Sequence, residues 1–271
     1  MDEPPLEIRR HYETIQEDRR ITEGLGQLEL LRTREVLSRY LPNSPSSILD
    51  IGGGTGVHAA WLAARGHSAH LVDLMPHHIE AASRLAVTSG QVTAEVGDAR
   101  ELPVADYTFD AALLLGPLYH LTEREARLQA WSEAQRVVRP GGYIFAAAIS
   151  RFASLFDGLA RGYLFDPVFR QIAEQDLHDG QHRNPTDAPN WFTTAYFHHP
   201  DDLQQEAEAT GVELVEVLGV EGLAGWLPQL NETWGTVEGQ ETIMFSARSI
   251  ESEPALLGLS AHLIAVTRSP R

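Results

Sequence analysis

The sequence predicts an α/β protein with a doubly wound, mostly parallel sheet of seven strands. Three observations favour this fold. Short apolar runs alternate with segments of helical periodicity, as in repeated strand–helix units. The runs are almost continuously apolar, which is typical of parallel strands buried on both faces. One run also leads through a glycine-rich turn straight into a helix. A chain of 271 residues is long enough for one such domain with added segments.

The elements follow in order along the chain. An N-terminal helical region spans residues 5–41 and ends at a Pro- and Ser-rich break. The predicted helix over 122–139 starts with Thr122 as N-cap and Glu125 three residues later, which is the pattern of a capping box. The other predicted helices are 55–65, 76–88 and 201–210, and the predicted strands are 47–51, 68–73, 92–96, 109–115, 143–149, 212–220 and 262–268.

The alternation of strands and helices divides the chain. It stops after the fifth strand, where residues 151–199 contain Gly, Pro, Asn, His and several aromatic residues, and resumes at residue 200. We therefore expect an N-terminal helical cap over 1–44, a core formed by 45–150 and 200–271, and an insertion over 151–199. The insertion is predicted to form a lid over the open end of the sheet. An exposed surface for docking another protein is the alternative.

The composition excludes several classes of function. The chain has no cysteine, and all 21 of its basic residues are arginine. Disulfides, Cys-based zinc sites, Schiff-base lysines and complete P-loops are therefore excluded. The net charge of -17 disfavours nucleic acid as a partner. The N-terminus does not resemble a signal peptide and the longest apolar runs are too short to span a bilayer, so a cytoplasmic location is expected. The oligomeric state is left open.

The first strand runs into a glycine-rich turn, DIGGGTG, from Asp50 to Gly56. Such a turn lets a ligand approach the backbone, and the helix behind it offers unpaired N–H groups to an anion. The dinucleotide-binding pattern G-x-G-x-x-G fails when read from Gly52. Read from Gly54, only its relaxed form ending in Ala matches, which is weak evidence for NAD as the ligand. Acids at the ends of the next two strands, Asp73 and Asp98, favour a different nucleotide-like ligand.

Five segments together resemble the class I, Rossmann-like S-adenosylmethionine-dependent methyltransferases. In order they are ILDIGGGTG, LVDLMP, VGDARELP, FDAALLLGPLYHL and RVVRPGGYIFAA, within about residues 45–150. More loosely, HYETIQEDRRI, GQLEL and FTTAYFHHPDDL resemble a bacterial subgroup of small-molecule methyltransferases. The resemblance implies S-adenosylmethionine as cofactor, S-adenosylhomocysteine as its product, and a small molecule as methyl acceptor.

The resemblance also implies roles for individual residues. Gly52 and Gly54 would flank the methionine part of the cofactor, and Asp50 would orient the turn. Asp73 would accept hydrogen bonds from both ribose hydroxyls. Asp98 would accept one from the adenine amino group, with the Ala99 N–H donating to the ring. Further implied contacts are Leu74 and Leu102 beside the adenine, Leu115 after the fourth strand, Arg20 at the cofactor carboxylate and Tyr12 closing over it; ordinary core leucines and an exposed helix face are the alternatives.

The segment after the fourth strand supplies the candidate catalytic residues. His120 titrates near neutrality and could act as a base, with Tyr119 positioning the acceptor; a structural turn histidine is the alternative. Arg151, His182, His198 and His199 could line the substrate chamber, or be exposed loop residues. No metal site is expected, because adjacent histidines do not face one ion. The predicted activity is methyl transfer to O or N; a non-catalytic cofactor-binding sensor or scaffold and, less favoured, an NAD(P)-dependent oxidoreductase are the alternatives.

Overall fold

The computed structural model describes residues 7, 26–186, 188, 190–227 and 230–271. Seven strands form one sheet in the order β3-β2-β1-β4-β5-β9-β8. Strands β1 to β5 are parallel, whereas β9 is antiparallel to both of its neighbours. The predicted seven-stranded, mostly parallel sheet is therefore confirmed. Its strands are β1 (Ser47–Ile51), β2 (Ser68–Asp73), β3 (Val92–Val96), β4 (Phe109–Leu114), β5 (Val138–Ile149), β8 (Glu213–Gly219) and β9 (His262–Arg268).

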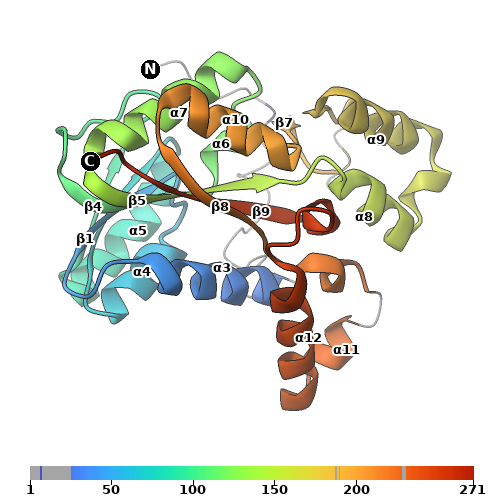
Figure 1. Cartoon of the computed structure of the whole chain (residues 1–271), viewed down its shortest axis with the longest axis horizontal. Helices are drawn as coiled ribbons and strands as arrows, with labels where there is room; N and C mark the ends of the chain where they lie inside the picture. Colours follow the sequence, from blue (N-terminus) through green and yellow to red (C-terminus); the bar gives the residue numbers. More distant parts are fainter. Residues whose placement is uncertain (1–6, 8–25, 187, 189, 228–229) are drawn as a thin grey trace.

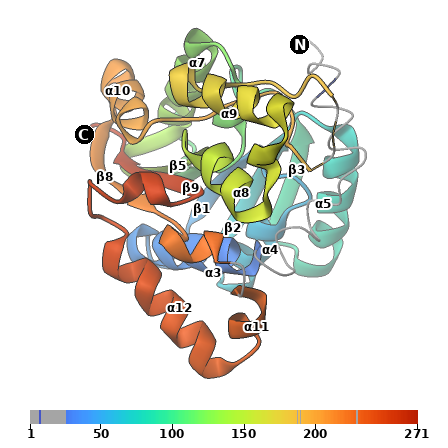
Figure 2. The ribbon, with the colours of Figure 1, turned by 90° about the vertical axis from the view of Figure 1, so that its right-hand side faces the viewer.

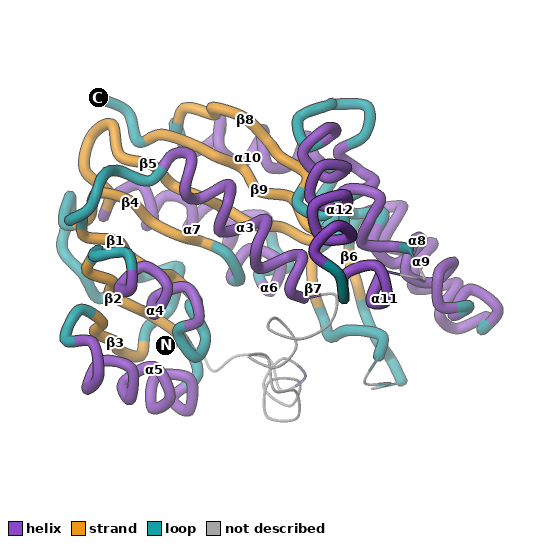
Figure 3. Tube along the Cα trace, turned by 90° about the horizontal axis from the view of Figure 1, so that it is seen from below, coloured by secondary structure: helices purple, strands orange, loops and turns teal. Residues whose placement is uncertain are grey.

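Helices cover both faces of this sheet (Figures 1 and 3). On one face, apolar residues of α3 (Gly26–Tyr40), α4 (Val57–Ala64) and α5 (Pro76–Ser89) share one buried cluster with alternate residues of the strands. On the other face, α7 (Arg124–Val137) and α10 (Pro200–Thr210) share a second cluster. Because side chains alternate across a strand, each apolar strand supplies both clusters.

The insertion after β5 lies at the end of the sheet where the parallel strands have their carboxyl ends (Figure 1, right). It contains the helices α8 (Ala153–Arg161) and α9 (Pro167–Asp179) and the strand pair β6 (Gln181–His182) and β7 (Ala195–Tyr196). Figure 2 looks onto this end and shows α8 and α9 in front of β5 and β9. This arrangement places the insertion over the edge where a ligand of an open α/β sheet binds.

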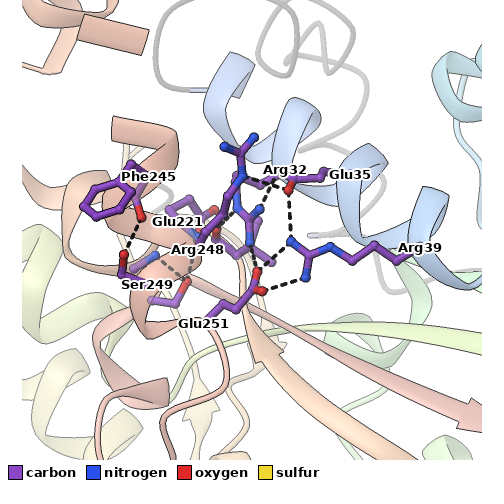
Figure 4. A network of polar contacts seen from close by, with 11 residues as sticks. Arg32, Glu35, Arg39, Glu221, Phe245, Arg248, Ser249 and Glu251 are labelled. Atoms are coloured by element: carbon purple, nitrogen blue, oxygen red, sulfur yellow. Dashed lines mark hydrogen bonds and ion pairs between the residues drawn. The ribbon is translucent and has the colours of Figure 1, made fainter. Parts of the chain in front are cut away.

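The C-terminal helices α11 (Leu230–Trp234) and α12 (Val237–Ile250) pack against α3 and project from the sheet (Figure 1). A polar network joins the same segments (Figure 4). The fully buried guanidinium of Arg32 donates to the Val220 carbonyl at 3.1 Å, to Glu35 at 2.6 Å and to Glu251. Arg248 and Arg39 complete the network on the same two glutamates. These bonds fix α3 relative to the end of β8.

Two predicted boundaries were wrong. Helix α7 begins at Arg124 after Glu123, with no side-chain cap, so the capping box expected at Thr122 is not formed. Instead, the Thr122 carbonyl accepts a hydrogen bond from Arg127, which holds this segment outside the helix. A capping box is found at α10, where His199 is the N-cap. Strand β5 begins at Val138, five residues earlier than predicted, because Val138 already pairs with Phe109.

Three short 3-10 helices complete the described elements, together with the one-turn helix α6 (Pro117–His120). The 3-10 helices are Tyr163–Phe165, Gly222–Trp226 and Leu257–Leu259. Of the predicted N-terminal helical region, the structure describes residue 7 and the part from Gly26 onward. In the part of the chain that the structure describes, every helix is too short or too polar to cross a lipid bilayer.

Candidate active site at the carboxyl ends of the strands

The glycine turn after β1 is tightly packed on one side and open on the other. A Cβ atom at Gly52 would lie 2.5 Å from Cγ of Pro117, and one at Gly53 would lie 2.6 Å from Cγ of Asp50. At Gly54 the same atom would meet no atom of the described residues within 4 Å, although the backbone there has a φ of 57°. The turn therefore needs glycine both for its backbone conformation and for close packing, and its open side is at Gly54.

Asp50 lies beneath this turn and is 1% exposed. Its carboxylate accepts a hydrogen bond from the backbone N–H of Ala59, while Oδ2 has no hydrogen-bond partner among the described residues. Burial, together with the nearby Asp73 carboxylate, raises the pKa of Asp50 to about 7. A buried polar atom of this kind suits a site that is completed by a ligand.

Asp73, at the end of β2, links the glycine turn to the second strand. Its Oδ2 accepts from the N–H of Gly54 at 2.9 Å, and its Oδ1 accepts from the N–H of Met75 at 2.8 Å. The ring Nδ1 of His78 lies 3.0 Å from Oδ1. A carboxylate has about four lone-pair sites, so Oδ2 keeps capacity for one further donor. The structure thus brings Asp73 to the open side of the turn.

Asp98 follows β3 at the same edge of the sheet. Its carboxylate accepts from the backbone N–H of Arg100 at 2.9 Å and from the Arg100 guanidinium at 2.6 to 3.1 Å. Burial alone would raise the pKa of Asp98, but the bonds from Arg100 hold it below its ordinary value. Asp98 is therefore ionised and already paired, so an adenine amino group would share the carboxylate with Arg100 or displace it.

The segment after β4 crosses the glycine turn. Pro117, which begins α6, packs on Gly52, and the Tyr119 hydroxyl lies 3.5 Å from where a Cβ of Gly116 would be. The rings of Tyr119 and His120 contact each other edge to face, and both contact Phe192 of the insertion. These two candidate catalytic residues therefore lie between the glycine turn and the insertion. The predicted cofactor contacts Leu74, Ala99 and Leu115 are half-buried near the same strand ends, and Leu102 is buried.

Two of the predicted substrate residues make polar contacts with other residues of the fold. Both ring nitrogens of His182 have partners, Oδ2 of Asp176 at 2.8 Å and the Trp191 carbonyl at 2.8 Å. The Arg151 guanidinium donates to Asp202 at 2.8 Å. Arg151 therefore ties the start of the insertion to α10, whereas His182 joins two segments within the insertion, and neither of the sequence-based alternatives anticipated these roles.

The other two predicted substrate histidines lie at the start of α10. His198 is fully buried, with Nε2 lying 3.6 Å from Glu206, and burial lowers its pKa. His199 is exposed and accepts a hydrogen bond from the N–H of Asp201 as the N-cap. The structure does not bring either ring to the glycine turn. Tyr12 and Arg20 lie outside the described residues.

Sequence reasoning missed a polar cluster on the same edge of the sheet. The cluster consists of a carboxylate oxygen of Glu29 (α3), a carboxylate oxygen of Glu221 (after β8) and a ring nitrogen of His262 (β9), which all lie within 4.8 Å of one another. Burial lowers the pKa of His58, in the first turn of α4, to about 4, and the nearby charge of Glu29 partly opposes this shift. The four residues are spread over more than 200 positions, so only the folded sheet brings them together.

Comparison with known proteins identifies the domain that carries this turn. Residues 48–142 match the family model described as a methyltransferase domain. An O-methyltransferase of Pyrenophora dematioidea is 35% identical over 120 residues, covering 42% of this chain and 43% of that protein. An O-methyltransferase of Aspergillus sclerotiorum is 34% identical over 140 residues, covering 46% and 52%. The chain thus spans about half the length of these relatives.

A solved structure extends the likeness of fold to most of the chain. A crystal structure described as a SAM-dependent methyltransferase of Methanosarcina mazei aligns with a TM-score of 0.57 at 18% identity. The alignment covers 87% of this chain and 97% of that protein. The glycine turn, Asp50, Asp73 and Asp98 all lie within the segment that matches the family model. Residues 48–142 therefore form a methyltransferase domain, and the chain has the fold of the class I S-adenosylmethionine-dependent methyltransferases.

Proposed function

We propose that the chain binds S-adenosylmethionine at the glycine turn and transfers its methyl group to an oxygen or nitrogen of a small molecule. The observation that carries this proposal is that three acids lie at the carboxyl ends of three neighbouring parallel strands, within the matched domain: Asp50 beneath the turn, Asp73 bonded to Gly54, and Asp98 after β3. The two relatives named O-methyltransferases favour oxygen over nitrogen as the acceptor atom.

The residues at the turn suit the parts of such a ligand. Gly54 leaves space for the methionine portion, and the remaining capacity of Asp73 Oδ2 suits a ribose hydroxyl. Among the described residues Oδ2 of Asp50 has no hydrogen-bond partner, and a positively charged ligand bound at the turn would stabilise the ionised carboxylate. When bound, S-adenosylmethionine supplies a methyl group on a positively charged sulfur. The chain then needs to align the acceptor and exclude water.

On the acceptor side, we assign Tyr119 and His120 to contacts with the small molecule, because they lie between the turn and Phe192 of the insertion. The region over 151–199 would act as a lid and residues 1–44 as a cap. The net charge of -17 disfavours polyanionic acceptors. The role of His120 as a base and the cytoplasmic location stay predictions from the sequence.

The test is a search for methylated product. The purified chain is incubated with S-adenosylmethionine and a panel of phenols, carboxylic acids and amines, and both S-adenosylhomocysteine and the product mass are followed. We expect turnover of at least one phenol or carboxylic acid. Binding of S-adenosylhomocysteine without turnover of any panel member would favour the sensor or scaffold function. Binding of NAD instead would favour an oxidoreductase.

A further inference from the structure

His262 and Glu221 form a carboxylate–imidazole pair at the edge of the sheet where the parallel strands have their carboxyl ends. Nδ1 of His262 lies 2.5 Å from Oε1 of Glu221, which is 4% exposed. The other oxygen, Oε2, accepts from the Ser260 hydroxyl at 2.8 Å and from the backbone N–H of His262 at 3.0 Å. Both carboxylate oxygens are therefore held, and the carboxylate is oriented toward the imidazole. This arrangement favours the tautomer with the proton on Nδ1 and the lone pair on Nε2.

The pairing of the strands places His262 near the residues after β4. His262, the first residue of β9, pairs directly with Ile149, the last residue of β5. Cross-strand partners project from the same face of a sheet. The Ile149 side chain belongs to an apolar cluster that also contains Tyr119, Phe192 and Trp226. The imidazole thus lies beside the cluster that borders the proposed acceptor.

The charges around the imidazole would stabilise its protonated form. Glu221 contacts Nδ1 directly, and a carboxylate oxygen of Glu29 on α3 lies 3.9 Å from the same atom. On the same side, the Arg32 guanidinium is paired with Glu35 and Glu251, and it binds the carbonyl of Val220 next to Glu221 (Figure 4). Two carboxylates therefore face the ring, while the nearby Arg32 is neutralised by other acids.

We propose that His262, oriented by Glu221, is the base that removes the proton of the methyl acceptor; this rests on the proposed methyl transfer. The acceptor oxygen or nitrogen gives its proton to Nε2 of His262 and forms the new bond to the methyl carbon. The bond between carbon and sulfur breaks, and its electron pair stays on sulfur, which becomes the neutral thioether of S-adenosylhomocysteine. The imidazolium that forms is stabilised by the carboxylate of Glu221.

This proposal gives His262 the role that the sequence suggested for His120. The described contacts of the His120 ring are aromatic, with Tyr119 and Phe192, which suits packing against an acceptor. His262 has a buried carboxylate that fixes its tautomer, as an efficient base requires. His120 then positions the acceptor and His262 takes the proton.

The test compares two substitutions at the pair with a matched control. His262→Asn keeps a donor for Glu221 but removes Nε2, and Glu221→Gln keeps the shape of the orienting group but removes its charge. His70→Gln alters a second histidine–glutamate pair, with Glu95, on β2 and β3. With an acceptor from the panel, we expect His262→Asn to lower turnover by about 10²–10⁴-fold and to abolish the acidic limb of the pH–rate profile. Glu221→Gln should lower turnover by at least about tenfold, and His70→Gln should leave it unchanged.

Two further measurements separate this proposal from its rivals. Titration with S-adenosylhomocysteine should give the same affinity for wild type and His262→Asn, because the proposed cofactor contacts lie elsewhere. Nitrogen NMR at pH 8 should show the proton of His262 on Nδ1. If the proposed methyl transfer itself is wrong, the wild type will neither bind S-adenosylhomocysteine nor form a methylated product. Unchanged turnover of His262→Asn in an active enzyme, a proton on Nε2, or activity lost with EDTA and restored by Mn²⁺ would each overturn the base role.

Discussion

The Oδ2 atom of Asp73 accepts a 2.9 Å hydrogen bond from the backbone N–H of Gly54. This bond ties the end of the second strand to the open residue of the glycine turn. The acid proposed to recognise the ribose therefore also shapes the turn proposed to hold the methionine portion. If the proposed ligand binds, its binding and the conformation of the turn are coupled through one side chain.

Substitution of Asp73 tests this coupling. Asp73→Ala should weaken binding of S-adenosylhomocysteine by about 1.5–3 kcal/mol, the range for hydrogen bonds to a charged group. Asp73→Asn should retain an acceptor for Gly54 and therefore lose less affinity than Asp73→Ala. Equilibrium titration measures both, with Glu95→Gln on β3 as a control that leaves affinity unchanged. Wild-type affinity in a folded Asp73→Ala chain would mean that β2 does not end at the ribose.

The raised pKa of Asp50, about 7, predicts a pH-dependent stability. The folded chain holds this proton more tightly than the unfolded chain, so stability falls as the pH rises from about 4 to about 7. A difference of about three pKa units corresponds to about 4 kcal/mol at pH 8. Asp50→Asn stays neutral, so it should be more stable than wild type at pH 8 and nearly equal at pH 4.

Urea unfolding of both chains at the two pH values measures this difference. Comparing variant with wild type at each pH cancels the titration of the other carboxylates. An equal stability difference at pH 4 and pH 8 would mean that the pKa of Asp50 is the same in the folded and unfolded chains, and the raised pKa would be refuted.

Signals between residues that are close together in sequence made the fold and the candidate cofactor site predictable. The turn from Asp50 to Gly56 and the acids Asp73 and Asp98 follow short apolar strands, and parallel strands bring their carboxyl ends to one edge. Each of these signals lies within a few residues of its strand, so no long-range contact had to be known.

The acceptor side depends on contacts between distant segments. Glu221 and His262 are separated by 41 positions, and their pairing follows from the antiparallel return of β9 between β5 and β8. His182 and His198 lie in segments whose sequence resembles a loop. In the structure both are buried, His182 beside Asp176 and His198 beside Glu206. No local pattern distinguishes a buried, paired histidine from one that lines a chamber.

The pair formed by Arg127 and Glu206 predicts a large effect on stability. Nε of Arg127 lies 2.6 Å from Oε1 of Glu206, and both side chains are almost fully buried between α7 and α10. Glu206→Ala leaves the guanidinium buried without its carboxylate and should destabilise the chain by about 3–5 kcal/mol in urea unfolding. The double substitution Arg127→Met with Glu206→Leu should cost less. A double variant as unstable as Glu206→Ala would show that the charge itself is not the cause.

His120 offers a test of the division of labour on the acceptor side. If its ring positions the acceptor beside Phe192, His120→Ala should raise KM and lower kcat by less than about tenfold, with the acidic limb of the pH–rate profile retained. If His120 is the base, kcat should fall by about 10²–10⁴-fold and that limb should vanish. Steady-state kinetics measured at about ten pH values across roughly pH 5–9 distinguishes the positioning role from the base role.

The glycine turn and its three acids are proposed to bind S-adenosylmethionine. Equilibrium titration of the purified chain with S-adenosylhomocysteine, and separately with NAD, tests it most directly. We expect one molecule of S-adenosylhomocysteine to bind per chain, with a rise in melting temperature as the ligand stabilises the folded state. NAD should give neither signal. Binding of NAD with no response to S-adenosylhomocysteine would rule out the glycine turn as a site for S-adenosylmethionine.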